Sequence, residues 1–89
     1  MTEQNLLIVN EKGLHARASA KFVEVVEAFD ATAEVSLNGV STTGDSIMGL
    51  LMLAASKGTT IDVRTSGNDA AKLADALEAL VANRFGEEY

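Results

Sequence analysis

Apolar and polar positions follow two different periods along the chain, and these periods separate strands from helices. Residues 6–9 form a short apolar run of strand length, and residues 33–37 and 60–64 alternate with a period of two, as half-buried strands do. The Asn38-Gly39 dipeptide favours a type I′ turn, so residues 40–43 are predicted to fold back as the second arm of an antiparallel hairpin. The pattern therefore predicts four strands.

Three segments have helical spacing instead. From Ala16 onward, apolar residues recur on one side and charged residues on the other, which predicts an amphipathic helix of about three turns. A second helix, short and apolar, is predicted to begin after Ser46, to run to about Ala54 and to end near Lys57-Gly58, where a basic residue and a glycine suit a C-terminus. The third is predicted to start after Asn68 and Asp69, which are interpreted as its cap residues.

The resulting order, βαββαβα, predicts an α+β fold. In this open-faced β-sandwich, a four-stranded antiparallel sheet is covered on one face by three helices, and residues 1–89 form a single domain. Residues 84–89 follow the last helix and are expected to be loose, with Arg84, Glu87 and Glu88 serving solubility.

The composition then narrows the possible functions. The chain has 89 residues, too few for a large cleft, so its function is expected on the surface. It lacks cysteine, which excludes disulfides and thiolate chemistry and favours a reducing cytoplasm. With a net charge of −6 and seven basic residues spread along the chain, nucleic acid is a poor partner. No basic leader or apolar stretch of about 18 residues indicates export or membrane insertion.

His15 is the only histidine, and it stands between a loop containing Gly13 and the first predicted helix. The first N–H groups of a helix lack internal partners and carry partial positive charge, so they favour an anion. Arg17 adds a guanidinium that can bind two phosphoryl oxygens. The triplet His15-Ala16-Arg17 is therefore interpreted as a nucleophile with an anion cradle.

An ordinary surface histidine beside a helix would give the same pattern. The chain offers no second histidine, no cysteine and no evident carboxylate cluster with which His15 could form a metal site or a catalytic triad. A chemically active His15 would have to work with backbone dipoles, Arg17 and the groups of a partner. We therefore expect no metal and no cofactor.

Gly13-Leu14-His15-Ala16-Arg17 resembles the phosphorylation-site motif of HPr, the histidine phosphocarrier family of the bacterial phosphoenolpyruvate-dependent phosphotransferase system. Residues 44–50 resemble the family's regulatory serine segment, and the resemblance extends over the whole chain and its βαββαβα order. It implies that His15 accepts a phosphoryl group on Nδ1, as a pros-phosphohistidine, from enzyme I and passes it to an enzyme IIA protein. Arg17 would stabilise that group.

The chain departs from the usual family pattern at Ala18-Ser19, where Pro-Ala is more common. This departure leaves His15 and Arg17 untouched. It leaves open whether the chain serves sugar uptake or the nitrogen-related regulatory branch, NPr.

Ser46 precedes an apolar helical run, so it has the properties of a simple N-cap residue. The resemblance implies a second role, phosphorylation by the HPr kinase/phosphorylase, which would add about −1.5 to −2 charge units beside Ile47 and Met48. Both roles are compatible.

The helix after Ser46 is more apolar than a short surface helix requires. Core packing accounts for several of its side chains. We expect Ile47 and Met48, with Ala16 and Ala20 of the first helix, to form a docking patch for protein partners around His15.

The leading hypothesis is thus a monomeric phosphocarrier, which is itself modified and is not a stand-alone enzyme. A second hypothesis is a binding module that acts through Ser46 phosphorylation while His15 is idle; an acid-labile phosphate on His15 would distinguish the two. A third, an unrelated α/β domain that binds a metabolite, would rest on fold class alone. A stand-alone enzyme is the least supported, because no substrate cleft is indicated.

Overall fold

A sheet and three helices form the fold, in the predicted order. The computed structural model describes residues 2–89. The strands are β1 (Thr2–Leu7), β2 (Thr32–Leu37), β3 (Val40–Thr43) and β4 (Thr60–Ser66). The helices are α1 (Ala16–Glu27), α2 (Ile47–Met52) and α3 (Ala70–Ala82), and a short turn, η1 (Arg84–Gly86), follows them.

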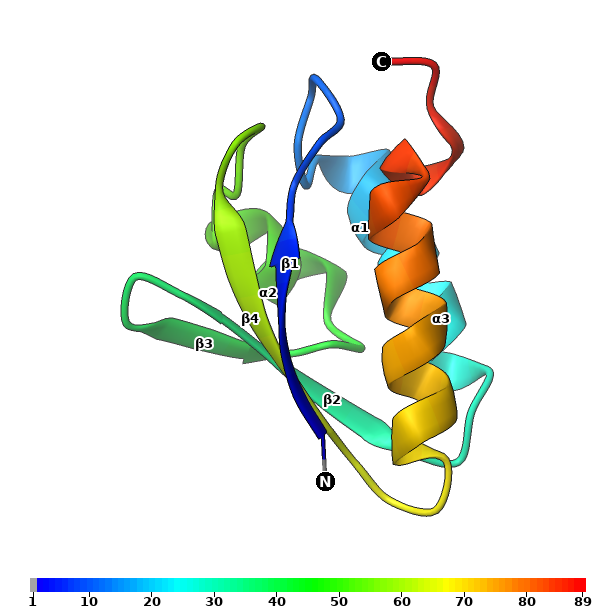
Figure 1. Cartoon of the computed structure of the whole chain (residues 1–89). Coiled ribbons are helices and arrows are strands. Elements are labelled where there is room, and N and C mark those ends of the chain that lie inside the picture. The colour runs from blue at the N-terminus through cyan, green and yellow to red at the C-terminus, as the bar shows by residue number, and fades with distance from the viewer. Residues whose placement is uncertain (1) are drawn as a thin grey trace.

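The four strands form one antiparallel sheet in the order β1-β4-β2-β3. Thr65 of the central strand β4 lies opposite Thr2 on one side and Ala33 on the other. The hairpin of β2 and β3 turns at Asn38 and Gly39, with φ angles of 51° and 82°, as a type I′ turn requires. The helices cover one face of the sheet (Figure 1). The predicted α+β open-faced sandwich is confirmed.

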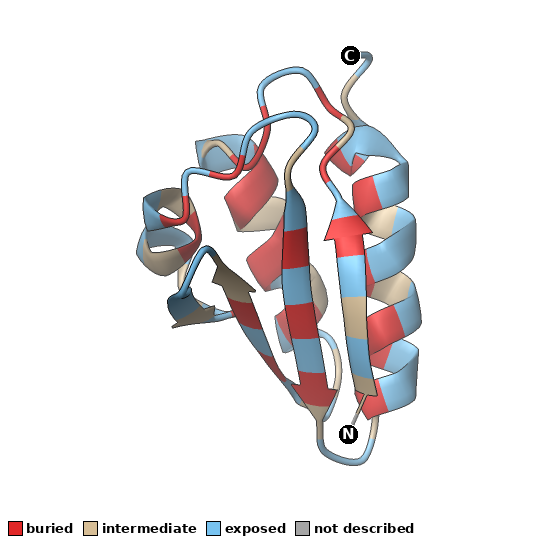
Figure 2. Cartoon of the chain, turned by 60° about the vertical axis from the view of Figure 1, so that its left-hand side comes forward, coloured by how far each residue is buried: buried red, intermediate tan, exposed pale blue. Residues whose placement is uncertain are grey.

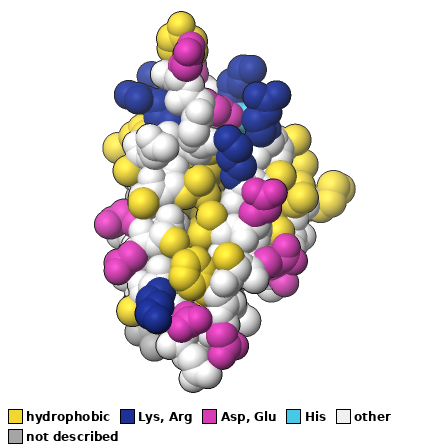
Figure 3. Space-filling view, turned by 90° about the vertical axis from the view of Figure 1, so that its right-hand side faces the viewer, with side chains coloured by type: hydrophobic (Ala, Val, Ile, Leu, Met, Phe, Trp, Pro, Cys, Tyr) yellow, Lys and Arg dark blue, Asp and Glu magenta, His cyan; other side chains and the backbone are white. Residues whose placement is uncertain are grey.

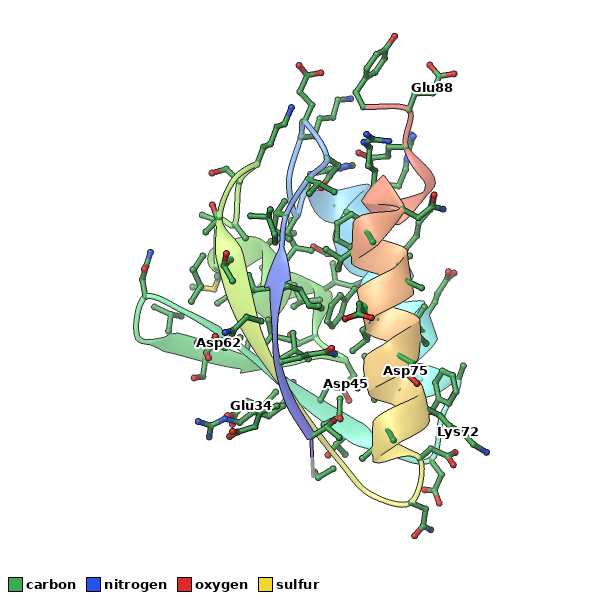
Figure 4. The ribbon with its side chains drawn as sticks, viewed as in Figure 1. Glu34, Asp45, Asp62, Lys72, Asp75 and Glu88 are labelled. Carbon is green, nitrogen blue, oxygen red and sulfur yellow. The ribbon has the colours of Figure 1, made fainter. Side chains whose placement is uncertain are left out.

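The hydrophobic core lies between the sheet and the helices. Along β4, buried and exposed residues alternate (Figure 2). The open face of the sheet is polar, and Glu34 and Asp62 extend from it (Figure 4). None of the helices formed by residues 2–89 is long and apolar enough to cross a membrane. The larger apolar side chains that are fully enclosed come from the sheet, the helices and their connections: Ile8, Phe22, Val35, Leu50, Ile61, Val63, Leu73, Leu77, Val81 and Phe85.

Two predicted boundaries differ from the observed ones. The first strand begins at Thr2, earlier than predicted, because the polar residues 2–5 also pair with β4. It ends at Leu7, before the apolar run of residues 6–9 is complete. The second helix ends at Met52, before the predicted end near Lys57-Gly58, since Ala54 has a left-handed φ of 54° that stops helical hydrogen bonding.

The cap prediction for the third helix is wrong in its chemistry. Asp69 occupies the N-cap position, but its side chain makes no capping bond. Its Oδ2 accepts a hydrogen bond from the backbone N–H of Asp30 (3.0 Å), and Asn68 donates to the Asp30 carboxylate (2.9 Å). These side chains join two turns at one end of the molecule instead of closing the helix.

The prediction that residues 84–89 are loose is also wrong. Phe85 is fully buried in the core, and Lys21 Nζ donates a hydrogen bond to its carbonyl oxygen (2.7 Å). Farther along, the backbone N–H of Glu11 donates to the Tyr89 carbonyl (3.0 Å). The C-terminal segment therefore lies against the loop between β1 and α1 (Figure 1).

Gly13 lets that loop approach the segment after α2 closely. Its φ is +66°, and a Cβ placed there would lie 2.4 Å from the carbonyl oxygen of Ala55. The next residue, Leu14, is buried, and its N–H donates to the same oxygen (2.8 Å). Only glycine satisfies both the backbone angle and the available space.

Gly13→Ala should therefore lower the free energy of unfolding more than a left-handed angle alone does. Gly58→Ala is the matched control, because Gly58 also has a positive φ (+89°) but has open space around its Cβ position. We expect Gly58→Ala to cost about 1 kcal/mol and Gly13→Ala to cost about 1–3 kcal/mol more, from the clash. Chemical denaturation measures both. Equal losses would show that the close approach to Ala55 is unimportant.

Candidate functional site

His15 caps the first helix at the end of the Gly13 loop. Its backbone is extended (φ −79°, ψ −176°), and its carbonyl accepts the first helical hydrogen bond, from Ser19 N–H (2.8 Å). Leu14 anchors the preceding position in the core, while Ser19 Oγ donates to the Leu14 carbonyl (3.2 Å). The imidazole is thereby held at the surface, 27% exposed, beside the free N–H groups of the first turn.

Basic side chains surround the imidazole. Arg17, which is exposed, lines one open groove with His15, Lys12 and Lys21. In Figure 3, dark-blue basic side chains lie near the cyan histidine at one end of the molecule, with magenta acidic side chains among them. Three acidic side chains, Glu11, Glu87 and Glu88, line the same groove, so the charges of these six side chains balance there, whereas the whole chain carries a net charge of −6.

A carboxylate from the C-terminal segment also reaches the site. Nε2 of His15 contacts Oε2 of Glu87, and Oε1 of Glu87 accepts a hydrogen bond from Asn10 Nδ2 (3.0 Å). Burial opposes ionisation of Glu87, but the hydrogen bonds from Asn10 and His15, the charge of a protonated His15 and the charge of Lys12 hold its pKa below the usual value. Glu87 is therefore an anion at neutral pH.

The backbone before Glu87 adopts a conformation that raises the free energy of the folded state. Arg84, Phe85 and Gly86 have φ angles of 56°, 54° and 79°, so two side-chain-bearing residues in succession adopt the left-handed region. Each costs about 1–2 kcal/mol. Burial of the Phe85 ring offsets this cost, and Glu87 N–H closes the turn on the Arg84 carbonyl (2.9 Å). The turn directs the chain back toward His15.

Ser46 begins the second helix as predicted. Its Oγ accepts a hydrogen bond from the backbone N–H of Gly49 (3.0 Å), so it is an N-cap residue, and it is half-buried. Gly49 lies so close to β3 that a Cβ there would be 1.8 Å from Thr42 Oγ1. This packing fixes the start of α2 against the hairpin.

The residues of the predicted docking patch are accessible to different degrees. Met48 is 70% exposed and Ile47 41% exposed, whereas Ala16 is exposed and Ala20 half-buried on α1, which packs against α2. Met52, one helical turn after Met48, is 75% exposed and extends the same apolar surface. The sequence analysis did not include Met52, although its spacing of four from Met48 indicates the same helix face.

The sequence analysis missed Glu87 and Asn10. Asn10 is fully buried although it lies in a polar loop, and Glu87 was assigned to a loose tail. One signal was available: Phe85 is an isolated aromatic residue followed by glycine, a pattern that suits an anchor and a turn. No local pattern indicates which carboxylate such a turn would bring to His15.

Comparison with known proteins agrees with this geometry. A model described as the PTS HPr component phosphorylation site matches residues 2–83. Phosphocarrier protein HPr of Cupriavidus necator is 46% identical over 87 residues, which are 98% of each chain. Phosphocarrier protein NPr of Shewanella violacea is 38% identical over 85 residues, 96% of this chain and 93% of its own. The crystal structure of HPr-C-His from Thermoanaerobacter tengcongensis has a TM-score of 0.94 at 34% identity, with both chains fully covered.

The family model spans most of the chain, and the match between structures extends over all of it. The resemblance noted in the sequence is thereby confirmed. The chain belongs to the HPr family of the phosphotransferase system and is a phosphocarrier protein rather than a stand-alone enzyme.

Proposed function

We propose that this protein accepts a phosphoryl group on Nδ1 of His15 from phosphorylated enzyme I and transfers it to an enzyme IIA protein, acting as a monomeric domain in the cytoplasm. The observation that carries the proposal is the placement of the only histidine at the N-cap of α1. There its Nδ1 makes no hydrogen bond within residues 2–89, and Arg17 and two lysines line the same groove.

Phosphoryl transfer needs alignment and charge stabilisation more than covalent help from the carrier. The first N–H groups of α1 offer donors for phosphoryl oxygens, and Arg17 adds an exposed guanidinium that makes no side-chain hydrogen bond or ion pair within residues 2–89. The groove is open, so a partner can supply the remaining groups. Such a site needs no metal or cofactor of its own.

The nucleophile is tested by incubation with enzyme I and phosphoenolpyruvate, followed by intact-mass analysis. Wild type should gain one acid-labile phosphoryl group, and His15→Ala should gain none. A stable phosphate, or an equal gain in His15→Ala, would refute the assignment. The absence of any gain in wild type would instead favour the binding-module hypothesis.

Arg17→Ala should slow phosphoryl acceptance on the order of 10²-fold, because one charged donor to the transferring group is lost. Arg64→Ala is the matched control: Arg64 lies on the open face of the sheet and pairs with Glu3 (3.1 Å). Its loss should leave the rate unchanged. The rate is measured by rapid quench with limiting enzyme I, and equal effects of the two substitutions would exclude the role of Arg17.

Partner docking is proposed for Ile47 and Met48 together with Ala16 and Ala20. Exposed methionine is flexible and polarizable, so one surface can fit several partners. Ala16 and Ala20 lie on α1, whose N-cap is His15, and α1 packs against α2, so a docked protein would lie within reach of the imidazole.

Met48→Glu should weaken the binding of enzyme I and of enzyme IIA at least about tenfold, since a charge must then be desolvated in the interface. Val40→Glu is the control, as Val40 is 51% exposed on β3, outside the patch. Calorimetric titration measures affinity, and thermal denaturation measures stability. A melting temperature that falls in step with affinity would attribute the loss to unfolding.

Regulation is proposed at Ser46, through phosphorylation by HPr kinase/phosphorylase. The N-terminus of α2 tolerates a negative charge, whereas an apolar or acidic partner surface does not. Ser46 lies directly before Ile47 and Met48, so the charge would enter the proposed docking patch. The modification would thus reduce docking without unfolding the domain.

Ser46→Asp should mimic this effect, because aspartate also caps helices and keeps the fold. We expect phosphoryl acceptance from enzyme I to slow by about tenfold in Ser46→Asp. Ser41→Asp is the control, because Ser41 is an exposed residue of β3, and this variant should keep the wild-type rate. Steady-state transfer assays at fixed ionic strength compare the two. A wild-type rate for Ser46→Asp would remove the support for regulation at this serine.

A further inference from the structure

The contact between Glu87 and His15 connects the C-terminal segment to the reacting ring. We propose that Glu87 is a positioning residue: its carboxylate holds neutral His15 in the tautomer with the proton on Nε2, which leaves the lone pair on Nδ1 as the nucleophile. This inference rests on the proposed function of His15 and identifies the group that decides which ring nitrogen reacts.

The direction of the Asn10 amide supports this assignment. Asn10 is fully buried, and its Nδ2 donates to the carbonyl oxygen of Gly13 (2.8 Å), which can only accept. The amide nitrogen therefore faces Glu87 as well, and it donates to Oε1 (3.0 Å). The Asn10 amide oxygen is buried and has no hydrogen-bond partner among residues 2–89. The amide is therefore oriented so that Nδ2 donates, although this leaves its oxygen unsatisfied.

Glu87 consequently acts only as an acceptor. With Asn10 donating to Oε1, the contact between Oε2 and Nε2 of His15 requires a proton on the nitrogen, because an ionised carboxylate has none to give. The lowered pKa of Glu87 agrees with an ionised state. In the neutral imidazole a proton on Nε2 leaves Nδ1 unprotonated. Nδ1 is also the nitrogen that makes no hydrogen bond within residues 2–89.

The transfer step then balances without a further acid or base. The Nδ1 lone pair forms a bond to phosphorus while the bond between phosphorus and the donor protein breaks, and that electron pair stays with the donor. Nε2 keeps its proton, so the phosphorylated ring gains a positive charge, which the Glu87 carboxylate faces. Glu87 thus stabilises the charge that develops on the ring during transfer.

The partners of this carboxylate direct its charge toward Nε2. The groove is lined by three basic side chains, Lys12, Arg17 and Lys21, and by three acidic ones, Glu11, Glu87 and Glu88. Glu87 is engaged on both oxygens, by Asn10 and by His15. Its charge is therefore directed at Nε2, on the far side of the ring from the reacting Nδ1.

Glu87→Gln provides the sharpest test. With Asn10 still donating to the side-chain oxygen, the new NH₂ group would face Nε2, which must then accept, so the proton moves to Nδ1. Glu88→Gln is the matched control, because Glu88 lies in the same segment and groove, makes no side-chain hydrogen bond among residues 2–89, and extends outward in Figure 4. Nitrogen-15 NMR of the neutral ring reports the tautomer, and rapid-quench assays report the rate.

We expect wild type and Glu88→Gln to hold the Nε2–H tautomer. Glu87→Gln should shift toward Nδ1–H and should accept the phosphoryl group roughly 10- to 100-fold more slowly. A tautomer ratio and rate equal to those of Glu88→Gln would overturn the inference. Failure of wild type to accept any phosphoryl group would overturn the proposed function instead, while the tautomer spectra would still decide whether Glu87 positions the ring.

Discussion

The site depends on the close approach of the loop before α1 to the segment after α2. Gly13 lies against the carbonyl of Ala55, and Leu14 bonds to the same oxygen from a buried position. Since His15 follows directly, the position of its backbone is fixed, and only rotation about its side-chain bonds remains for Glu87 to restrict. The core thus fixes a surface residue through two neighbours, which is how a small domain can hold one imidazole in a defined place without a cleft around it.

Regular periodicity made most of the fold predictable. The alternation in residues 33–37 and 60–64, together with the turn at Asn38 and Gly39, was sufficient to predict the hairpin and the strand that pairs with it. Helix positions followed from spacing and from the Ser46 cap, which the structure confirms. The start of the first strand was not predictable in the same way, because its polar residues belong to the strand through their pairing with β4 and not through an alternating pattern.

The candidate site was only half predictable. His15 and Arg17 occur in one short motif, so local sequence brings them together. Glu87 is 72 residues away from His15, and its arrival depends on the burial of Phe85 and on three consecutive left-handed residues. This backbone conformation after α3 results from tertiary packing. Local sequence alone favours disorder at a chain end. Side chains with two possible partners, such as Asp69, are likewise assigned only by the tertiary structure.

The bond from Glu11 to the Tyr89 carbonyl has a practical consequence for how this protein is handled. Any polypeptide joined after Tyr89, such as an affinity tag or a fusion partner, would start beside the groove that contains the imidazole, and it would compete there with an approaching protein. The start of β1 lies at the opposite end of the molecule (Figure 1). Additions are therefore better placed before residue 2, where they leave the histidine accessible.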